Sequence, residues 1–410
     1  MTYKTHKIFV NPRHALFKAL DNYAFLAKNL YNSTFYRHRQ DYKDGKKKVG
    51  WMALNKEFRS TNQPDFRAIP SSMAALIVKA VDGEYESCFG RRKAGLKAKF
   101  PQYKHPIEGR YKLIFNEKLI SKKALKRGYL KLTTPKSIKE ELKFKLPKKI
   151  DYTTIKEVTV TKFNDGYMIN IISKIEFIEF KVKEYNNVAA IDLGLKNLVA
   201  CVSNNKMKPF LISGCPINSF NHFWNRKISK LKSKLDTSKD EGEKKALKDK
   251  INFSSRRRNF KVNDYLHKAS HTLINHLDSN QINSLVIGYN QGWKQDINLG
   301  KKVNQKFCNL PFYKFLQMVT YKCEAKGITV KTQEESYTSK CSFLDNEEVC
   351  KHDSYLGKRV KRGLFRASNG SEINADINGA YNILVKAIGK FNYRPIQVCG
   401  LPSTLRVEFK

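Results

Sequence analysis

The stretch AAIDLGLKNL, residues 189–198, decides how the C-terminal half of this chain folds. It begins as an apolar strand and carries Asp192 at a position where the pattern calls for a core residue. A buried carboxylate without partners is costly, so we expect Asp192 to have some. Gly194 allows the backbone to pass close to a bound phosphate, and Lys196 adds a cation beside it. An aspartate that merely ends a strand and caps a turn is the simpler interpretation of this segment alone.

The segments around this stretch predict an α/β domain of the RNase H-like class. Apolar runs rich in β-branched residues predict strands, and apolar residues at three-and-four spacing predict helices. The expected order is three strands, a long charged helical region, a strand, a helix, a strand and a last helix. These elements are VAAIDL (188–193), NLVACVS (197–203), PFLIS (209–213), the helical region 219–277, NSLVIGY (283–289), a helix from Pro311, ITVKTQ (328–333) and a helix from about residue 374.

A second carboxylate, Asp376, lies in INADINGAYNI, residues 373–383, at the first turn of the last helix. The simpler interpretation is an ordinary aspartate stabilised by the helix dipole. Two carboxylates on a strand and a helix that converge are, however, what a hard cation such as Mg²⁺ requires. Paired metal ions activate water and stabilise the leaving oxygen in phosphodiester hydrolysis. Asp192 and Asp376 are therefore candidate catalytic and metal-binding residues.

Positive charge runs along the whole chain. The 410 residues include 78 Lys and Arg against 37 Asp and Glu, a net charge of +41. Such self-repulsion predicts a polyanionic partner. The chain has no apolar run long enough to span a membrane and no basic amphipathic helix with a clean apolar face, which argues against a membrane surface. Nucleic acid is the expected partner, and a structural RNA-binding protein is the simpler alternative to an enzyme.

The N-terminal half predicts a small antiparallel sheet or barrel with a helical insertion. A strand at residues 7–10 precedes two amphipathic helices, and β-type runs separated by turns follow between residues 110 and 180. The pair Asp165-Gly166 between two such runs signals a hairpin. We expect a β domain formed by residues 1–12 and 105–186, a helical subdomain at 13–104, and a boundary near 181–187 before the α/β domain 187–410.

Two basic clusters are candidate nucleic-acid contacts. Arg91, Arg92 and Lys93 open the stretch RRKAGLKAKFPQYKH, whose aromatic residues either stack on bases or anchor a solvated loop. Arg256, Arg257 and Arg258 form the second cluster, in SSRRR, and a solvated helix end is the simpler interpretation there. Lys196 is a third candidate, beside Asp192.

Four segments resemble the successive signature segments of the TnpB family, transposon-associated proteins similar to the type V CRISPR effectors. They are IDLGLKNL (191–198), NDYLHKAS (263–270), YTSKC (337–341) and INADINGAYNI (373–383). The resemblance covers the whole chain. It implies a multidomain protein in which a wedge-like β-barrel carries an inserted helical recognition subdomain and precedes a RuvC-type, RNase H-like nuclease domain.

The resemblance also implies an activity. It implies a guide RNA from the transposon end and cleavage of both strands of target DNA beside a short motif, with two Mg²⁺ ions for which Mn²⁺ can substitute. Asp192 and Asp376 match the first and last catalytic acids of the family, and the arginines at 256–258 could grip the guide–target heteroduplex through its phosphates.

The middle acid departs from the family pattern. Most members carry a glutamate after the strand that aligns with SLVIG, where this chain has Gly288. Some members of the superfamily carry it on the next strand, just before the Thr-Ser pair, where this chain has Glu334 and Glu335. Because successive strand residues face opposite sides, only one should point inward. We favour Glu335, which precedes Thr338 by three residues; Glu334 is the fallback, and a solvent-facing acid is the simpler interpretation.

The segment 336–373 resembles a degenerate zinc-ribbon insertion. Relatives often carry two CxxC pairs there, a strong tetrahedral site. This chain has Cys341, Cys350 and His352, with Leu344 where a partner cysteine would stand. We therefore expect no zinc, and we expect packing and nucleic-acid contacts to hold this segment.

The sequence also bears on the location of the protein, its oligomeric state and its alternative functions. Residues 1–12 lack the charged-then-apolar pattern of a secretion signal, so we expect a protein of the prokaryotic cytoplasm, associated with the nucleoid when bound to DNA. We expect a monomeric ribonucleoprotein. The main rival is a nuclease-inactive, RNA-guided DNA-binding repressor, since Gly288 cannot bind metal, and a direct transposase is a third reading.

Overall fold

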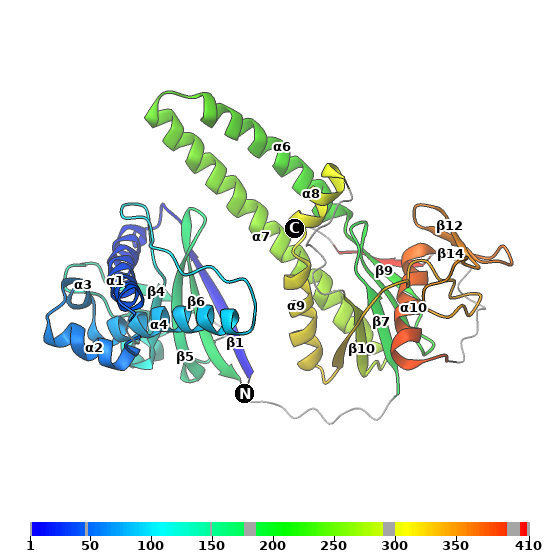
Figure 1. Ribbon diagram of the computed structural model, residues 1–410, viewed down its shortest axis with the longest axis horizontal. Helices are drawn as coiled ribbons and strands as arrows, with labels where there is room; N and C mark the ends of the chain where they lie inside the picture. The colour runs from blue at the N-terminus through cyan, green and yellow to red at the C-terminus, as the bar shows by residue number, and fades with distance from the viewer. Residues whose placement is uncertain are drawn as a thin grey trace. The chain divides into compact units, whose positions relative to one another are not determined.

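The computed structural model describes residues 2–45, 48–147, 150–175, 186–289, 300–391 and 402–407. The chain forms two compact units, residues 1–178 and 179–410, each with its own apolar core (Figure 1). Of the boundary segment expected at 181–187, only residues 186 and 187 lie within the described part. No helix in the described ranges is both long and apolar enough to cross a bilayer.

An antiparallel sheet forms the base of the N-terminal unit. Its strand order is β1-β6-β5-β2, and β3 and β4 make a separate two-stranded sheet. Among the described residues these pairings leave β1 and β2 as edges, so hydrogen bonding does not close the barrel we expected. The strands are β1 (Thr2–Val10), β2 (Leu113–Asn116), β3 (Tyr129–Leu132), β4 (Leu142–Lys145), β5 (Ile155–Phe163) and β6 (Gly166–Ile175).

The hairpin between β5 and β6 lies one residue earlier than the sequence predicted. Gly166 already pairs with Phe163, so the two turn residues are Asn164 and Asp165. Asn164 takes the positive φ of 52° that this turn requires, which asparagine tolerates. Gly166 is needed for another reason: a Cβ there would lie 2.3 Å from the Phe9 ring. The prediction of a hairpin from Asp165-Gly166 was therefore correct. Glycine is required at 166, however, by the close approach of Phe9 and not by the turn.

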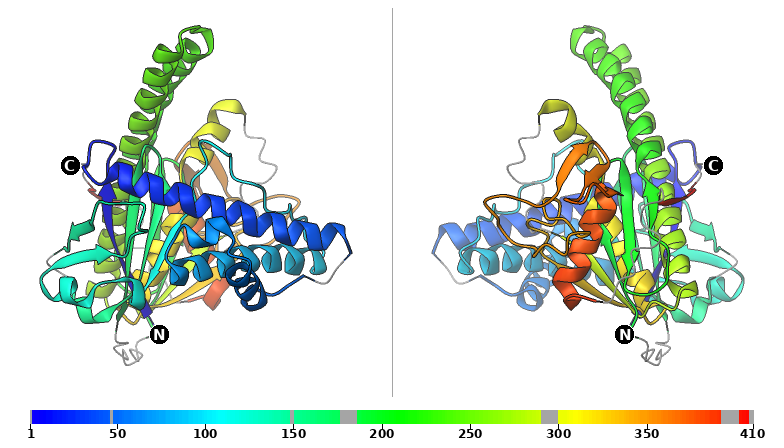
Figure 2. Two further views of the ribbon diagram at one scale, coloured as in Figure 1. Left: turned by 90° about the vertical axis from the view of Figure 1, so that its left-hand side faces the viewer. Right: turned by 90° about the vertical axis from the view of Figure 1, so that its right-hand side faces the viewer.

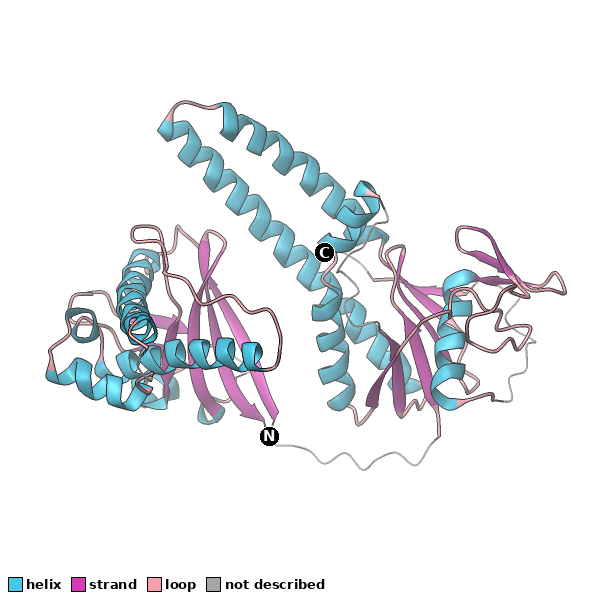
Figure 3. Cartoon of the chain, in the orientation of Figure 1, coloured by secondary structure: helices cyan, strands magenta, loops and turns pink. Residues whose placement is uncertain are grey.

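Four helices lie between β1 and β2 in the chain. The apolar faces of α1 and α4 are buried in the core that the sheet shares, and Figure 3 shows these helices grouped on one side of it. The helix expected from Pro70 begins at Ser71, with Pro70 as its N-cap residue. The helices are α1 (Phe17–Lys43), α2 (Trp51–Ser60), α3 (Pro64–Arg67) and α4 (Ser71–Lys93); short α5 (Lys122–Lys126) and two 3₁₀ turns (Glu117–Leu119, Tyr152–Thr154) follow.

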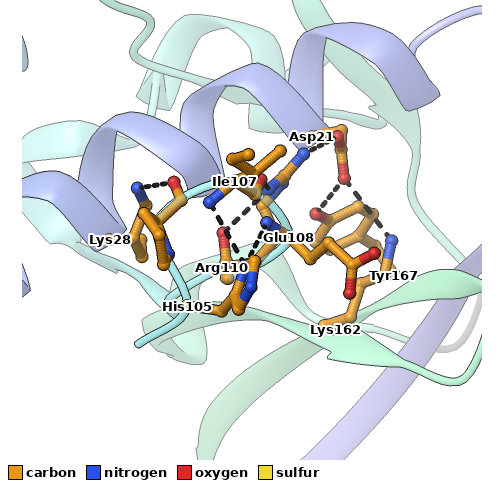
Figure 4. Close-up of polar contacts among 10 residues, drawn as sticks. Asp21, Lys28, His105, Ile107, Glu108, Arg110, Lys162 and Tyr167 are labelled. Carbon is orange, nitrogen blue, oxygen red and sulfur yellow. Dashed lines mark hydrogen bonds and ion pairs between the residues drawn. The ribbon is translucent and has the colours of Figure 1, made fainter. Parts of the chain in front are cut away.

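A polar network joins α1 to the sheet and to the loop before β2 (Figure 4). The Asp21 carboxylate accepts hydrogen bonds from Arg110 Nη2 and from the Tyr167 hydroxyl, each at 2.7 Å, and Lys162 Nζ lies 3.4 Å away. Burial opposes ionisation of Asp21, but these bonds prevail and lower its pKa. On α1, Lys28 Nζ donates to the Pro106 carbonyl at 2.6 Å. The basic loop that follows α4 is thus tied to α1.

A six-stranded mixed sheet forms the centre of the C-terminal unit. Its order is β11-β10-β7-β8-β9-β15; β10 runs parallel to β7 and β11, and β7, β8 and β9 are antiparallel. This is the arrangement expected from the element order of an RNase H-like domain. The strands are β7 (Val188–Asp192), β8 (Asn197–Ser203), β9 (Phe210–Ser213), β10 (Ser284–Gly288), β11 (Thr329–Gln333) and β15 (Ser403–Leu405).

Helices cover both faces of this sheet. One apolar cluster joins the sheet to α7 and α9, and a second joins its other face to α10. The helical region predicted as one element is a hairpin of two helices, which Figures 1 and 2 show as a long arm leaving the sheet. The helices are α6 (Cys215–Thr237), α7 (Glu241–Ser279), α8 (Lys301–Asn309), α9 (Phe312–Glu324) and α10 (Ala375–Ile388).

The segment between β11 and α10 is held by side chains that bind backbone groups. Glu347 is buried, and its carboxylate accepts hydrogen bonds from the Ser342 N–H at 2.6 Å and the Leu356 N–H at 3.0 Å. On α10, Asn378 donates to the Cys341 carbonyl at 2.9 Å. This hydrogen bonding supports the expectation that packing holds the segment. Its three-stranded sheet is β12 (Lys358–Lys361), β13 (Leu364–Arg366) and β14 (Glu372–Asn374).

Candidate active site

Asp192 ends β7 on the face of the sheet that α10 covers. Ala190 packs in the cluster shared with α10, whereas Ile191 packs on the opposite face. Because strand residues alternate between faces, Asp192 points the same way as Ala190. A Cβ placed on Gly379 of α10 would lie 3.0 Å from Asp192 Oδ2. The Asp192 carboxyl group therefore lies directly under α10.

Asp376 lies at the start of α10, close to the same face. Asn374 caps the helix, and its side-chain oxygen accepts from the Asp376 N–H at 3.0 Å. The Asp376 carboxylate in turn accepts a hydrogen bond from Asn197 Nδ2, at 2.7 Å from its Oδ2. Since Asn197 is the first residue of β8, this bond ties the helix start to the loop that follows Asp192. Asp376 is thus oriented from both its own helix and the sheet.

Glu335 lies beyond the end of β11 and reaches the same region. Gly288 ends the neighbouring β10 and pairs with Gln333, so β11 delivers Glu335 just past this point. A Cβ placed on Gly288 would lie 2.8 Å from Glu335 Oε2. Glu335 and Asp376 both raise the pKa of Asp192 through their charges. The structure therefore brings the three candidate acids together from β7, the end of β11 and α10.

Glu334 points elsewhere. Its carboxylate accepts from Lys386 Nζ at 2.6 Å and from the Ser336 N–H at 2.7 Å, and its side chain is 53% exposed. These bonds to Lys386 and Ser336 lower the Glu334 pKa to about 2. Of the two adjacent glutamates, Glu335 is the one whose charge raises the pKa of Asp192. Both lie beyond Gln333, the last residue of β11, so strand alternation is not what separates them.

The electrostatics of Asp192 distinguish it from an ordinary strand-end aspartate. Burial, followed by the charges of Glu335 and Asp376, raises its pKa to about 8, although the Leu193 N–H and Arg359 act in the opposite direction. Part of the residue remains accessible to solvent even though protein atoms surround the carboxyl group. Without a cation, these effects favour the protonated form of Asp192. A cation between these acids would favour its ionised form.

Arg359 of β12 brings a positive charge to the same centre. Its Nη2 lies 3.8 Å from Asp376 Oδ1, and the side chain is 49% exposed. An ion pair this exposed contributes little to stability. The guanidinium can therefore leave Asp376 when another cation or a phosphate group enters.

The donor set suits a hard cation. The three acids offer carboxylate oxygens, which Mg²⁺ prefers. Among the described residues, no group of three or more His, Cys, Asp and Glu side chains is arranged so that it could hold a metal ion. Mg²⁺ is, however, commonly bound through one or two carboxylates, with water and substrate phosphates completing its shell. The side chains present therefore fit a magnesium ion whose coordination a nucleic acid completes.

Sequence reasoning missed three residues of this centre. Asn197 lies within the motif that contains Asp192, and its position at the start of the next strand was the available signal. Gly379 lies within a run of good helix formers, where glycine costs about 0.5–1 kcal/mol of stability relative to alanine. A glycine at such a position signals close packing. Arg359 had no signal, because only the folding of the segment 336–373 brings it to Asp376.

The segments that contain the three acids are also the ones that match known protein families. A family model described as "Probable transposase" matches residues 173–294, which include Asp192. A second, described as "Cas12f1-like, TNB domain", matches residues 312–383, which include Glu335 and Asp376. The TnpB-like protein ORF457 of Acidianus two-tailed virus is 26% identical over 212 residues. These matches support a TnpB-family protein.

The extent of these similarities differs. The part aligned with the viral TnpB-like protein is 50% of this chain and 42% of that protein, so the chain spans less than half of its relative's length. The solved structure of a Cas12f1–sgRNA–target DNA complex matches 89% of this chain and 82% of its own, with a TM-score of 0.54 and 14% identity. At this identity the likeness shows the fold alone. The family predicted from the four segments is confirmed.

The arginine cluster at residues 256–258 divides into two kinds of residue. Arg258 Nη2 donates to the Asn309 carbonyl at 2.5 Å and its Nε donates to Asn221 Oδ1 at 2.9 Å. Burial lowers the pKa of Arg258. Arg256 is buried, Arg258 is half-buried, and of the three only Arg257 is exposed. Of the three, Arg257 is thus the one presented to a phosphate.

The cluster of Arg91, Arg92 and Lys93 in the last turn of α4 also divides by its contacts. Arg92 donates from Nε to the Ala98 carbonyl at 3.0 Å, and its guanidinium lies 3.9 Å from the Phe100 ring centre. Phe100 packs against Phe89, with ring centres 5.5 Å apart, so it anchors the loop instead of offering a free stacking face. Arg91 and Lys93 are exposed, and so is Lys196 in the other unit. These three remain open to nucleic acid.

A pocket of about 480 Å³ lies between α2 and α4 in the N-terminal unit. Its wall includes Asn55, which is 7% exposed and whose amide oxygen and nitrogen have no hydrogen-bond partner among the described residues. An unsatisfied buried amide costs about 1–3 kcal/mol. Trp51, Lys56 and Arg59 line the same pocket. The pocket thus presents an aromatic ring, an amide without a partner among the described residues and two cations.

Proposed function

We propose that this protein is an RNA-guided endonuclease that cuts both strands of target DNA beside a short motif. The observation that carries the proposal is the approach of Asp192, Glu335 and Asp376 to one another on one face of the sheet, where burial and then the charges of the other two acids raise the pKa of Asp192. A protein that only binds DNA gains nothing from three acids placed together. Clustered acids with perturbed pKa values are characteristic of catalytic sites.

In the proposed mechanism Asp192, Glu335 and Asp376 would supply the carboxylates for Mg²⁺, or for Mn²⁺ in its place, and water and substrate phosphates would complete the coordination. Bound magnesium would activate the attacking water and stabilise the leaving oxygen. Asn197 keeps one Asp376 oxygen engaged, so the other, which faces Arg359, is available to a cation. Asp192 must release its proton before it can bind a cation, and a bound cation would lower its pKa below the cation-free value of about 8, so activity should rise with pH below that value. Arg359 is then free to neutralise a substrate phosphate.

The net charge and the family support RNA and DNA as partners. A charge of +41 needs polyanions to offset it. The matched Cas12f1 structure is a complex with guide RNA and target DNA. We propose that this chain likewise binds a guide RNA, encoded at the transposon end, and double-stranded DNA. Arg257, Lys196, Arg91 and Lys93 would contact phosphates. We further propose a prokaryotic cytoplasmic ribonucleoprotein with one copy of the chain, whose single nuclease centre makes both cuts in turn.

The pocket between α2 and α4 is the proposed place where the short motif is read. Asn55 can donate and accept, as an asparagine does toward the N6 and N7 edge of adenine. Trp51 lies in the same wall, and Lys56 and Arg59 are exposed at its side. Base contacts give specificity while phosphate contacts give position. This pocket offers both kinds of group.

One experiment tests the proposed function. Guide-loaded protein is incubated with target plasmid and Mg²⁺, comparing wild type with Asp192→Ala and Asp376→Ala. We expect wild type to linearise the plasmid and both variants to bind target DNA without cutting it. If wild type binds the target and never cuts, the repressor alternative replaces the endonuclease. A wild type that neither binds nor cuts guided targets would refute both.

A further inference from the structure

Gly288 occupies the position where most family members place a glutamate. The structure shows which atoms occupy the space that a side chain at 288 would take. A Cβ on Gly288 would lie 2.8 Å from Glu335 Oε2 and 2.5 Å from Ile383 Cδ1. Real Cβ atoms essentially never approach other heavy atoms this closely. The space that any side chain at 288 would enter is thus occupied by the ends of the Glu335 and Ile383 side chains, which would have to shift to admit it.

Backbone geometry does not explain this glycine. Gly288 is absent from the residues with positive φ and forms regular parallel pairs in β10. Any amino acid can adopt such an extended backbone. Glycine within a strand weakens it and often marks a place where another group approaches closely. Here the approaching group is Glu335.

Position 288 also points toward the acid centre. Val286, two residues earlier, packs in the cluster shared with α10, so position 288 faces α10 as well. The pairing Ile287↔Ile191 between β10 and β7 places position 288 beside Asp192. A carboxylate carried by residue 288 would therefore enter the region that the Glu335 carboxylate reaches from the end of β11.

We propose that Gly288 is a positioning residue, whose missing side chain makes the room in which Glu335 stands, and that carboxylates at 288 and 335 exclude each other. The inference rests on the proposed function, which assigns Glu335 to metal binding. Two carboxylates in this space would clash, and their like charges would repel each other beside Asp192. Either residue alone supplies the third acid.

A four-way comparison tests the exclusion: wild type, Gly288→Glu, Glu335→Ala, and Gly288→Glu with Glu335→Ala. Two quantities are measured on guide-loaded protein, the rise in Tm caused by Mg²⁺ and the rate of target cleavage. We expect each single variant to lose at least tenfold in rate and most of the Mg²⁺-dependent rise in Tm. The double variant should recover at least tenfold in rate over Glu335→Ala, together with the Mg²⁺ response.

A milder variant keeps the test decisive if glutamate at 288 disturbs folding. Gly288→Ala adds only the Cβ and should lower the rate by about three- to tenfold by displacing the Glu335 carboxylate. Gly83→Ala is the matched control, because a Cβ at Gly83 meets nothing within 4 Å. It should leave both readouts unchanged.

The possible failures are distinguishable. If Gly288→Glu and Gly288→Ala bind Mg²⁺ and cut as wild type does while Glu335→Ala is inactive, the exclusion is wrong and the proposed function survives. A double variant that folds and yet behaves as Glu335→Ala also overturns the exclusion. If wild type shows neither a Mg²⁺ response nor cleavage, the proposed function itself fails.

Discussion

The amide of Asn197 donates a 2.7 Å hydrogen bond to the carboxylate of Asp376, a residue 179 positions later in the chain. It joins the start of β8 to the first turn of α10. A hydrogen bond to a charged acceptor is shorter and stronger than a neutral one. Asn197 therefore fixes which Asp376 oxygen remains available to a cation.

Asn197→Ala should lower cleavage about 10- to 100-fold, the range that corresponds to the 1.5–3 kcal/mol of a charge-assisted hydrogen bond. The loss should be partly overcome by more Mg²⁺, because the Asp376 carboxylate is present but no longer oriented. Single-turnover rates measured across a Mg²⁺ series check this. Target binding in EDTA should be unchanged, and an unaltered Mg²⁺ requirement would contradict the role of Asn197.

Asp192→Asn should stabilise the metal-free protein at pH 8 while abolishing cleavage. The folded-state pKa of Asp192 is raised to about 8. The stability that its protonated form contributes is complete below about pH 4 and is lost as the pH rises through about 8. Asparagine avoids this loss. We expect a Tm higher by about 4–8 °C at pH 8, the shift that roughly 2 kcal/mol gives in a unit of this size.

The same measurement at pH 5 should show a smaller gain, because most of the penalty accrues above that pH. Saturating Mg²⁺ should reduce or reverse the gain by binding wild type. Glu334→Gln is the control and should give no gain, since Glu334 is ion-paired with Lys386. A lower Tm for Asp192→Asn at pH 8 would contradict the electrostatics described for this centre.

Arg257 and Arg258 should behave differently although they are adjacent. Arg258→Ala removes hydrogen bonds to Asn221 and Asn309 and should lower the Tm by about 4–8 °C, on the order of 2 kcal/mol. Arg257→Ala should leave the Tm unchanged and weaken nucleic-acid binding, with the salt dependence reduced by about one phosphate contact. Thermal melts and binding across a salt series separate the two. Equal effects on both readouts would show that the cluster acts as a unit.

Asn55→Leu should stabilise the free protein by about 1 kcal/mol, because it removes a buried amide that has no partner. Binding to DNA that carries the target-adjacent motif should weaken about tenfold if Asn55 reads a base. Asn32→Leu is the matched control. Its amide makes two 2.9 Å hydrogen bonds with the Lys104 backbone, so the same change should destabilise the protein. Unchanged motif selectivity in Asn55→Leu would remove this pocket from DNA reading.

Much of the fold could be predicted because its apolar periods are strong. The start of α4 followed from Pro70 and Ser71, and the buried strands β7, β8 and β10 followed from their continuous apolar runs. The break between α6 and α7 did not, because both sides of residues 238–240 are similarly charged and polar. The strand β15 is three residues long and takes its conformation from pairing with β9, which no local pattern reveals.

The site could be predicted in part. Asp192 interrupts an apolar strand pattern, and Asp376 lies in the first turn of an amphipathic helix. Strand alternation, which favoured Glu335 over Glu334 in the sequence, does not apply, because both residues lie beyond the end of β11. The identities of Asn197 and Arg359 as neighbours of Asp376 depend on distant segments meeting, which a local pattern does not encode. Among the basic residues, composition alone could not separate Arg257 from Arg258, because burial and hydrogen bonding decide their roles.

The most direct test of the central claim compares two adjacent acids in one assay. Guide-loaded wild type, Glu335→Gln and Glu334→Gln are each given target plasmid and Mg²⁺, and linear product is measured over time. The account predicts that Glu335→Gln lowers the rate by at least about 10³-fold with target binding intact, whereas Glu334→Gln stays within about threefold of wild type. Cleavage that survives Glu335→Gln would contradict an active centre built from Asp192, Glu335 and Asp376.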